Sequence, residues 1–240
     1  MSYANTYARP LQNVTPTERV EYLKKVLSWT CGGLFIAAVC GIGMTGILAF
    51  AQIPFLLSPM GQIIVIFGSM FITNSVAQRM VFGQQKVFGF ILGNAFEGIA
   101  LGYILLMAVM VGLGQGNPFG LIITALGLTG LTAAGMVAYL WSNPKEFNML
   151  GALLSALTLP MLILMGVMFI FPGFLSGGLM LGLCVLFVAV SAGSLLYQIN
   201  AVLHKLNTNQ HIEGSYLISI GILVLFWNLL FLLIQLANND

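Results

Sequence analysis

Charged residues are scarce in this sequence. Only 6% of the 240 residues are Asp, Glu, Lys or Arg, whereas hydrophobic residues make up 59%. A soluble domain carries roughly 25% charged residues, so a globule of this composition would lack the polar surface that keeps a protein dissolved. The composition therefore excludes an ordinary soluble domain and predicts a single membrane domain that contacts the lipid bilayer.

Residues typical of catalytic centres are also missing. The last residue, Asp240, is the only aspartate, and no HExxH, GxSxG or phosphate-loop motif occurs. Neither His204 nor His211 lies deep in an apolar run beside a serine. The three cysteines lie inside apolar runs without the spacing of metal ligands: Cys31, Cys40 and Cys184. We therefore expect no enzyme, no metal centre, no cofactor and no nucleic-acid partner.

Long apolar runs occupy most of the chain. A helix needs about 20 consecutive apolar residues to cross the hydrocarbon core of a bilayer, and seven runs meet this requirement. The predicted spans are 26–50, 59–78, 87–113, 118–141, 149–171, 175–197 and 215–236. The predicted fold class is all-α, a polytopic integral membrane protein with seven transmembrane helices.

The first two dozen residues are polar and do not resemble a cleavable signal peptide. Within them, residues 15–18 (TPTE) have the form of a capping box with Pro at the first helical position, so a helix should begin there. We divide the chain into a cytoplasmic segment with the start of helix one (1–25), a seven-span membrane domain (26–237) and a tail (238–240).

Positive charge occurs on only one side of the predicted membrane. The basic residues precede span one, separate spans two and three or four and five, or follow span six: Arg9, Arg19, Lys24, Lys25, Arg79, Lys86, Lys145 and Lys205. By the positive-inside rule, this pattern predicts a multi-pass protein of the cell inner (plasma) membrane with a cytoplasmic N-terminus. The C-terminus lies outside if the seventh segment crosses fully and inside if it is re-entrant; the sequence leaves both open.

Glu97 is the one ionisable residue well inside an apolar run. About ten residues of helical rise place it roughly 15 Å from Lys86, near the bilayer midplane. A carboxylate at that depth is costly, so we expect it to be protonated, paired or facing a wet cavity. Asn94 lies one helical turn earlier on the same face. Two interpretations are open: a proton or cation site, or a neutral glutamic acid that holds helices together.

Asn228 lies within the last apolar run. An amide inside a membrane needs hydrogen-bond partners, so we expect Asn228 to make polar contacts, with bonding between helices as the simpler interpretation.

Several segments resemble the Bax inhibitor-1/YccA family in their order and spacing. They are 95–98 (AFEG) with 101–105 (LGYIL), 125–129 (ALGLT) with 138–151 (AYLWSNPKEFNMLG), 196–198 (LYQ) through His204, and Asn228 in an apolar last helix. The resemblance covers about residues 15–237. It implies a seven-span fold in which antiparallel helices surround a central C-terminal helix.

The resemblance also implies one of two activities. Some members are pH-sensitive calcium leak channels that use an acidic pair, one residue just after a Tyr in span six and one in the last helix. Bacterial YccA-type members bind and restrain an ATP-dependent membrane protease. In this sequence the pair positions are Gln198 and Leu225, neither of which can bind calcium as a carboxylate does.

We therefore expect a non-enzymatic bacterial membrane protein that modulates membrane protein quality control by restraining a membrane-bound ATP-dependent protease. Two alternatives are open. One is a Ca2+ or H+ leak channel that relies on Glu97. The other is a structural membrane subunit.

Overall fold

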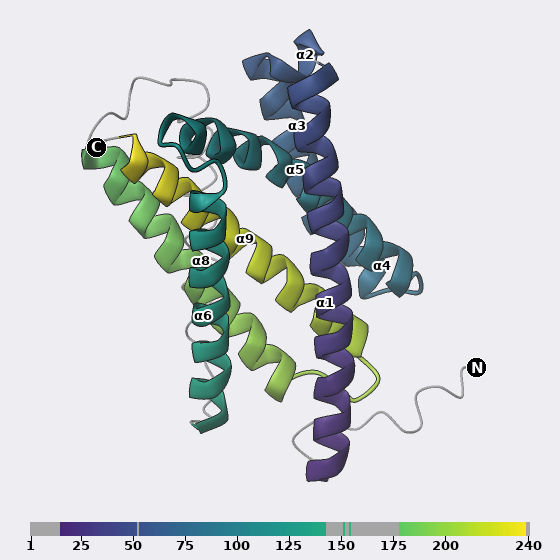
Figure 1. Ribbon diagram of the computed structural model, residues 1–240. Coiled ribbons are helices and arrows are strands. Elements are labelled where there is room, and N and C mark those ends of the chain that lie inside the picture. The colour runs from purple at the N-terminus through teal and green to yellow at the C-terminus, as the bar shows by residue number, and fades with distance from the viewer. Residues whose placement is uncertain (1–14, 52, 143–150, 152–153, 155–177, 239–240) are drawn as a thin grey trace.

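The computed structural model describes residues 15–51, 53–142, 151, 154 and 178–238, and this part of the chain is almost entirely helical (Figure 1). The α-helices are α1 (Pro16–Gly46), α2 (Pro54–Leu57), α3 (Pro59–Phe71), α4 (Gln78–Val81), α5 (Lys86–Gly114), α6 (Gly120–Ser142), α8 (Gly178–His204) and α9 (His211–Ala237). Two short π-helical segments are η3 (Ile47–Ala51) and η4 (Ile72–Ala77). The predicted all-α fold class is confirmed.

The start of α1 is the predicted capping box. The backbone N–H of Glu18 donates to Thr15 Oγ1 at 3.4 Å, and the N–H of Thr15 donates to Glu18 Oε2 at 2.9 Å. These two bonds satisfy donors that the first turn of a helix would otherwise leave free. From this cap α1 continues for 31 residues without interruption.

Six helical segments are long and apolar enough to cross a membrane among the described residues. They correspond to predicted spans one to four, six and seven, whereas predicted span five, 149–171, lies outside the described residues. Two helices extend beyond the predicted spans, since α8 continues to His204 and α9 begins at His211. In both cases the helix extends into a polar stretch of the sequence. In α9 this is possible because Glu213 has an ion-pair partner inside the bundle.

Helix α9 occupies the centre of the bundle. It packs against α1, α5, α6 and α8, as the family resemblance implied, and it runs diagonally across the molecule in Figure 1. It is one uninterrupted helix of 27 residues, which is long enough for a full crossing. One of its neighbours, α5, packs most extensively against α1, where Gly98 touches the backbone of Ala37. Glycine at this position lets the two backbones meet without a side chain between them.

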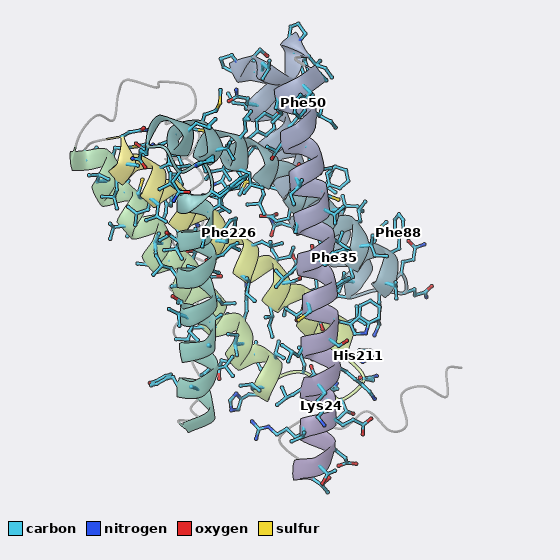
Figure 2. All side chains as sticks on the ribbon, viewed as in Figure 1. Lys24, Phe35, Phe50, Phe88, His211 and Phe226 are labelled. Atoms are coloured by element: carbon cyan, nitrogen blue, oxygen red, sulfur yellow. The ribbon has the colours of Figure 1, made fainter. Side chains whose placement is uncertain are left out.

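The outer surface is apolar. Phe35, Phe50 and Phe88 are 70%, 90% and 57% exposed and point away from the helices, whereas Phe226 is only 7% exposed and lies inside (Figure 2). Aromatic side chains this exposed would be unfavourable in water but suit contact with lipid tails. The chain is thus a multi-pass membrane protein.

Candidate functional site

Glu97 lies in the middle of α5 and is 5% exposed. Its carboxyl group shares a hydrogen bond with the side chain of Thr73 in η4, and the phenol of Tyr216 on α9 is close enough to feel its charge. Three separate elements therefore converge on this carboxyl group. The sequence identified Glu97 by its depth in an apolar run, but it contained no local signal for Thr73 or Tyr216.

Thr73 and Tyr216 are fixed by further hydrogen bonds. The Tyr216 hydroxyl donates to the backbone oxygen of Thr73 at 2.6 Å, and the Thr73 hydroxyl donates to the backbone oxygen of Gly93 at 3.3 Å. Gly93 makes room for the phenol, because a Cβ there would lie 2.5 Å from the Tyr216 hydroxyl oxygen. The π-helical turn at η4 is a bulge of a kind that is frequent at functional sites. These contacts hold α5, η4 and α9 together beside Glu97.

Asn94 is fully buried but faces a different neighbour. Its Nδ2 donates to the backbone oxygen of Phe90 at 2.8 Å, while its Oδ1 has no hydrogen-bond partner among the described residues. Gly33 of α1 lies against this amide, since a Cβ at Gly33 would be 2.8 Å from Asn94 Oδ1. Asn94 and Glu97 are one turn apart on α5, as predicted. Their contacts nevertheless differ, because Asn94 meets α1 whereas Glu97 meets η4.

A second buried carboxylate was missed by the sequence argument. Glu213, 2% exposed, pairs with Lys86 at a distance of 2.6 Å between Oε1 and Nζ. The sequence suggested that Glu213 lies in a connector outside the span 215–236. The one sequence feature that pointed to Glu213 was its position directly before an apolar run. The partner could not be found, because 127 residues separate it from Glu213.

The ends of three helices meet around this ion pair. The hydroxyl of Tyr22 in α1 donates to the backbone oxygen of Gln210 at 3.4 Å, just before α9. The charges of Lys25, Glu213 and Lys86 all act on the ring of His211. Figure 2 shows Lys24 and His211 at this same end of the molecule. The starts of α1, α5 and α9 thus form one charged end of the bundle, which we call the basic end.

The resemblance assigns the family's acidic-pair positions to Gln198 and Leu225, which lie at another interface, between α8 and α9. Leu225 is 1% exposed and packs in a cluster with Leu195, Ile199 and Leu229. Gln198 donates through Nε2 to Ser194 Oγ at 3.4 Å, and its amide lies against Gly221, one turn before Leu225 on α9. The two positions therefore do face the same interface. Aliphatic packing surrounds Leu225, a position that the resemblance assigns to an acidic residue in other members.

Asn228 is half-buried in α9, and its Nδ2 donates to the backbone oxygen of Val224 at 2.9 Å. This bond stays within one helix, so it gives no support to a role of the amide nitrogen in joining helices. Among the described residues, no three His, Cys, Asp or Glu side chains lie close enough to hold a metal ion.

A comparison with protein families finds one that covers nearly the whole chain. The family described as inhibitor of apoptosis-promoting Bax1 matches residues 19–239. No curated protein and no solved structure matches the chain. The chain belongs to the Bax inhibitor-1 family, as the resemblance of its segments suggested.

Proposed function

We propose that this non-enzymatic membrane protein lets protons or other cations leak across the membrane. Glu97 is the residue that binds the proton or cation on its way through. The observation that carries the proposal is the carboxyl group itself, 5% exposed in the middle of a membrane-spanning helix and bonded to Thr73. Ionisable residues inside membranes are costly and commonly mark ion or proton pathways.

The surroundings of Glu97 suit both of its protonation states. The Thr73 hydroxyl has one proton and can also accept hydrogen bonds. It can donate to an ionised Glu97, or it can accept from a protonated Glu97 while it donates to the backbone oxygen of Gly93 at 3.3 Å. A group that stays hydrogen-bonded in both states can gain and lose a proton without leaving a buried polar atom unpaired.

The side chains around Glu97 favour binding of a proton over binding of calcium. Calcium takes 6–8 oxygen ligands, several of them usually carboxylates. The resemblance assigns the family's two acidic positions to Gln198 and Leu225, and within the described residues no group of three or more His, Cys, Asp or Glu side chains could hold a metal ion. A single carboxyl group with hydroxyl neighbours is a sufficient site for a proton but a poor one for a divalent cation.

The proposed orientation places the basic end in the cytoplasm of the inner (plasma) membrane. Arg19, Lys24 and Lys25 lie at the start of α1, and Lys86 begins α5. Basic residues are enriched on the cytoplasmic side of membrane proteins. With this orientation α9 runs from the cytoplasm outward.

Flux through liposomes tests the proposal. Purified protein is reconstituted, and proton and calcium fluxes are followed with pH-sensitive and calcium-sensitive dyes at several pH values. We expect a proton flux that Glu97→Gln abolishes and that Glu21→Gln leaves unchanged, because Glu21 is an exposed residue paired with Lys25 on the surface of α1. The absence of flux in the unmodified protein, or equal flux in Glu97→Gln, would contradict the proposal.

Restraint of a membrane-bound ATP-dependent protease is a second candidate. It is favoured by the aliphatic packing around Leu225, which leaves the α8–α9 interface without the carboxylates of a calcium channel. Co-purification from membranes in mild detergent tests it. We expect a protease to be retained with the protein, and the candidate fails if only lipid and detergent accompany it.

A further inference from the structure

Fully buried polar side chains are unevenly distributed along the α1–α5–α9 interface. Within the described residues of these three helices, they all lie between the basic end and the level of Glu97: Thr30, Asn94, Glu97, Glu213, Ser215 and Ser219. The other half of the interface is lined by apolar side chains: Leu101, Ile104, Ala108, Leu223, Phe226, Leu230 and Ile234. Glu97 stands at the boundary between a polar half and an apolar half.

Three buried polar atoms in the polar half have no hydrogen-bond partner within the described residues. They are Thr30 Oγ1, Asn94 Oδ1 and Glu213 Oε2. Buried polar groups in folded proteins are nearly always hydrogen-bonded to protein or to water, because an unmade bond costs free energy. Three such atoms in one helix interface indicate that water can reach it.

The contacts of α1 show that these atoms lie along one line. The Ser215 hydroxyl donates to the backbone oxygen of Val26 at 2.9 Å, near the basic end. Gly33, two turns further along α1, touches the amide of Asn94. Thr30 lies between Val26 and Gly33 on the same helical face, because residues three and four apart are neighbours on a helix surface. The unpartnered atoms thus follow one another from Glu213 toward Glu97.

Beyond Glu97 the same interface is closed. Gly98 touches the backbone of Ala37, and a Cβ at Gly102 would lie 2.6 Å from the Met44 side chain. Helices that pack this closely leave no space for a chain of water molecules, which also needs polar partners. The polar side chains described there already have protein partners, since Thr45 Oγ1 donates to the backbone oxygen of Gly102 at 3.1 Å and the Tyr103 hydroxyl donates to that of Leu56 at 3.2 Å. The unpartnered polar atoms of this interface therefore lie on one side of Glu97 only.

We propose that water enters the α1–α5–α9 interface from the basic end and reaches Glu97 along Thr30 and Asn94, so that in the conformation that the structure shows Glu97 exchanges protons with that side of the membrane. Leakage then requires a second conformation in which the opposite half of the interface opens. The ion pair between Lys86 and Glu213 closes the entrance. Lys86 is 35% exposed whereas Glu213 is 3% exposed, so the lysine side chain covers the carboxylate from outside. The proposal deepens the proposed function, since it assigns the side from which Glu97 is reached.

Cysteine accessibility tests the route without any measurement of flux. In a background with Cys31, Cys40 and Cys184 replaced by Ser, single Asn94→Cys and Leu101→Cys variants are reconstituted in liposomes. A small, charged, membrane-impermeant methanethiosulfonate is then applied from either side. We expect Asn94→Cys to react from the basic end and Leu101→Cys to remain unreactive from both. Reaction of Leu101→Cys at a similar rate, or reaction of Asn94→Cys from the opposite side only or from neither side, would overturn the proposal.

The entrance is tested by adding Lys86→Gln to the Asn94→Cys variant. Loss of the pair should raise the labelling rate severalfold, because the lysine side chain then no longer covers the entrance. If Lys86→Gln does not fold, Lys86→Gln with Glu213→Gln removes both charges together and should give the same rise. The reversed pair, Lys86→Glu with Glu213→Lys, should restore slow labelling. An unchanged rate in the folded variants would show that the pair does not close the route.

The labelling and flux experiments can fail separately. If Glu97 carries no leak but Asn94→Cys is reached from the basic end, the route stands and the proposed function does not. If flux depends on Glu97 but Asn94→Cys and Leu101→Cys label alike, the function stands and the one-sided route is wrong.

Discussion

Two buried interfaces of this protein differ in the side chains that surround a chosen position. At the α5–η4–α9 interface, Glu97 lies beside Thr73 and Tyr216, whose hydroxyls are hydrogen-bonded across elements. At the α8–α9 interface, Leu225 is packed among aliphatic residues, at a position that the family resemblance assigns to an acidic residue. The comparison teaches that a carboxyl group is tolerated in this bundle where neighbouring helices offer hydrogen-bond partners. Elsewhere, close aliphatic packing fills the space.

The largest loss of stability should come from introducing a carboxyl group at Leu225. Leu225→Asp places a carboxyl group in the aliphatic cluster, where an unpaired charge or unbonded carboxyl is expected to cost about 3–5 kcal/mol of stability. Thermal unfolding in detergent measures the loss, with Leu225→Met as a control of similar volume that should cost under about 1.5 kcal/mol. Equal stability of the Asp and Met variants would show that the aliphatic cluster around Leu225 accommodates a carboxyl group.

Breaking the ion pair at the basic end should have the next largest effect. Lys86→Met leaves Glu213 buried without its cation, and we expect a loss of about 2–3 kcal/mol, reduced from a fully buried pair because Lys86 is partly exposed. Lys86→Gln with Glu213→Gln should recover most of the stability, since no uncompensated charge remains. Chemical or thermal unfolding of both variants checks this. A double variant as unstable as Lys86→Met would contradict the electrostatic explanation.

A smaller effect is expected from the hydroxyl that supports the Glu97 site. Tyr216→Phe removes the 2.6 Å bond to the backbone oxygen of Thr73, which should cost about 0.5–1.5 kcal/mol. The matched control is Tyr22→Phe, whose hydroxyl makes a longer bond of 3.4 Å to Gln210 and should cost less. Both are compared by thermal unfolding. The opposite order would mean that Tyr216 contributes mainly through its ring.

The smallest effect should follow from Asn228→Leu. The amide donates only to Val224 within α9 and is half-buried, so we expect a change within about 0.5 kcal/mol. The same measurement on Asn94→Leu serves as the comparison, because Asn94 is fully buried against Gly33 and should be more sensitive to a larger apolar side chain. A large loss in Asn228→Leu would show that the amide oxygen joins α9 to another helix.

Much of the architecture followed from local patterns. The capping box at Thr15 and Glu18, the positions of six spans and the family were predictable, because capping and hydrophobicity depend on residues that are close in sequence. The start of α9 was not, because Glu213 and Ser215 there bond to Lys86 and Val26, which are distant in sequence. The sequence alone identified Glu97 as a candidate site residue, because a carboxyl group deep in an apolar run is unusual whatever the tertiary structure.

By itself, the sequence determined that this is a helical membrane protein of the Bax inhibitor-1 family, with a carboxyl group deep in an apolar run at Glu97. Only the tertiary structure decided that Thr73 and Tyr216 meet Glu97, and that Lys86 pairs with Glu213. The physical reason is the range of the interactions. Membrane burial acts on each segment separately, whereas hydrogen bonds and ion pairs between helices depend on how segments far apart in the chain pack together.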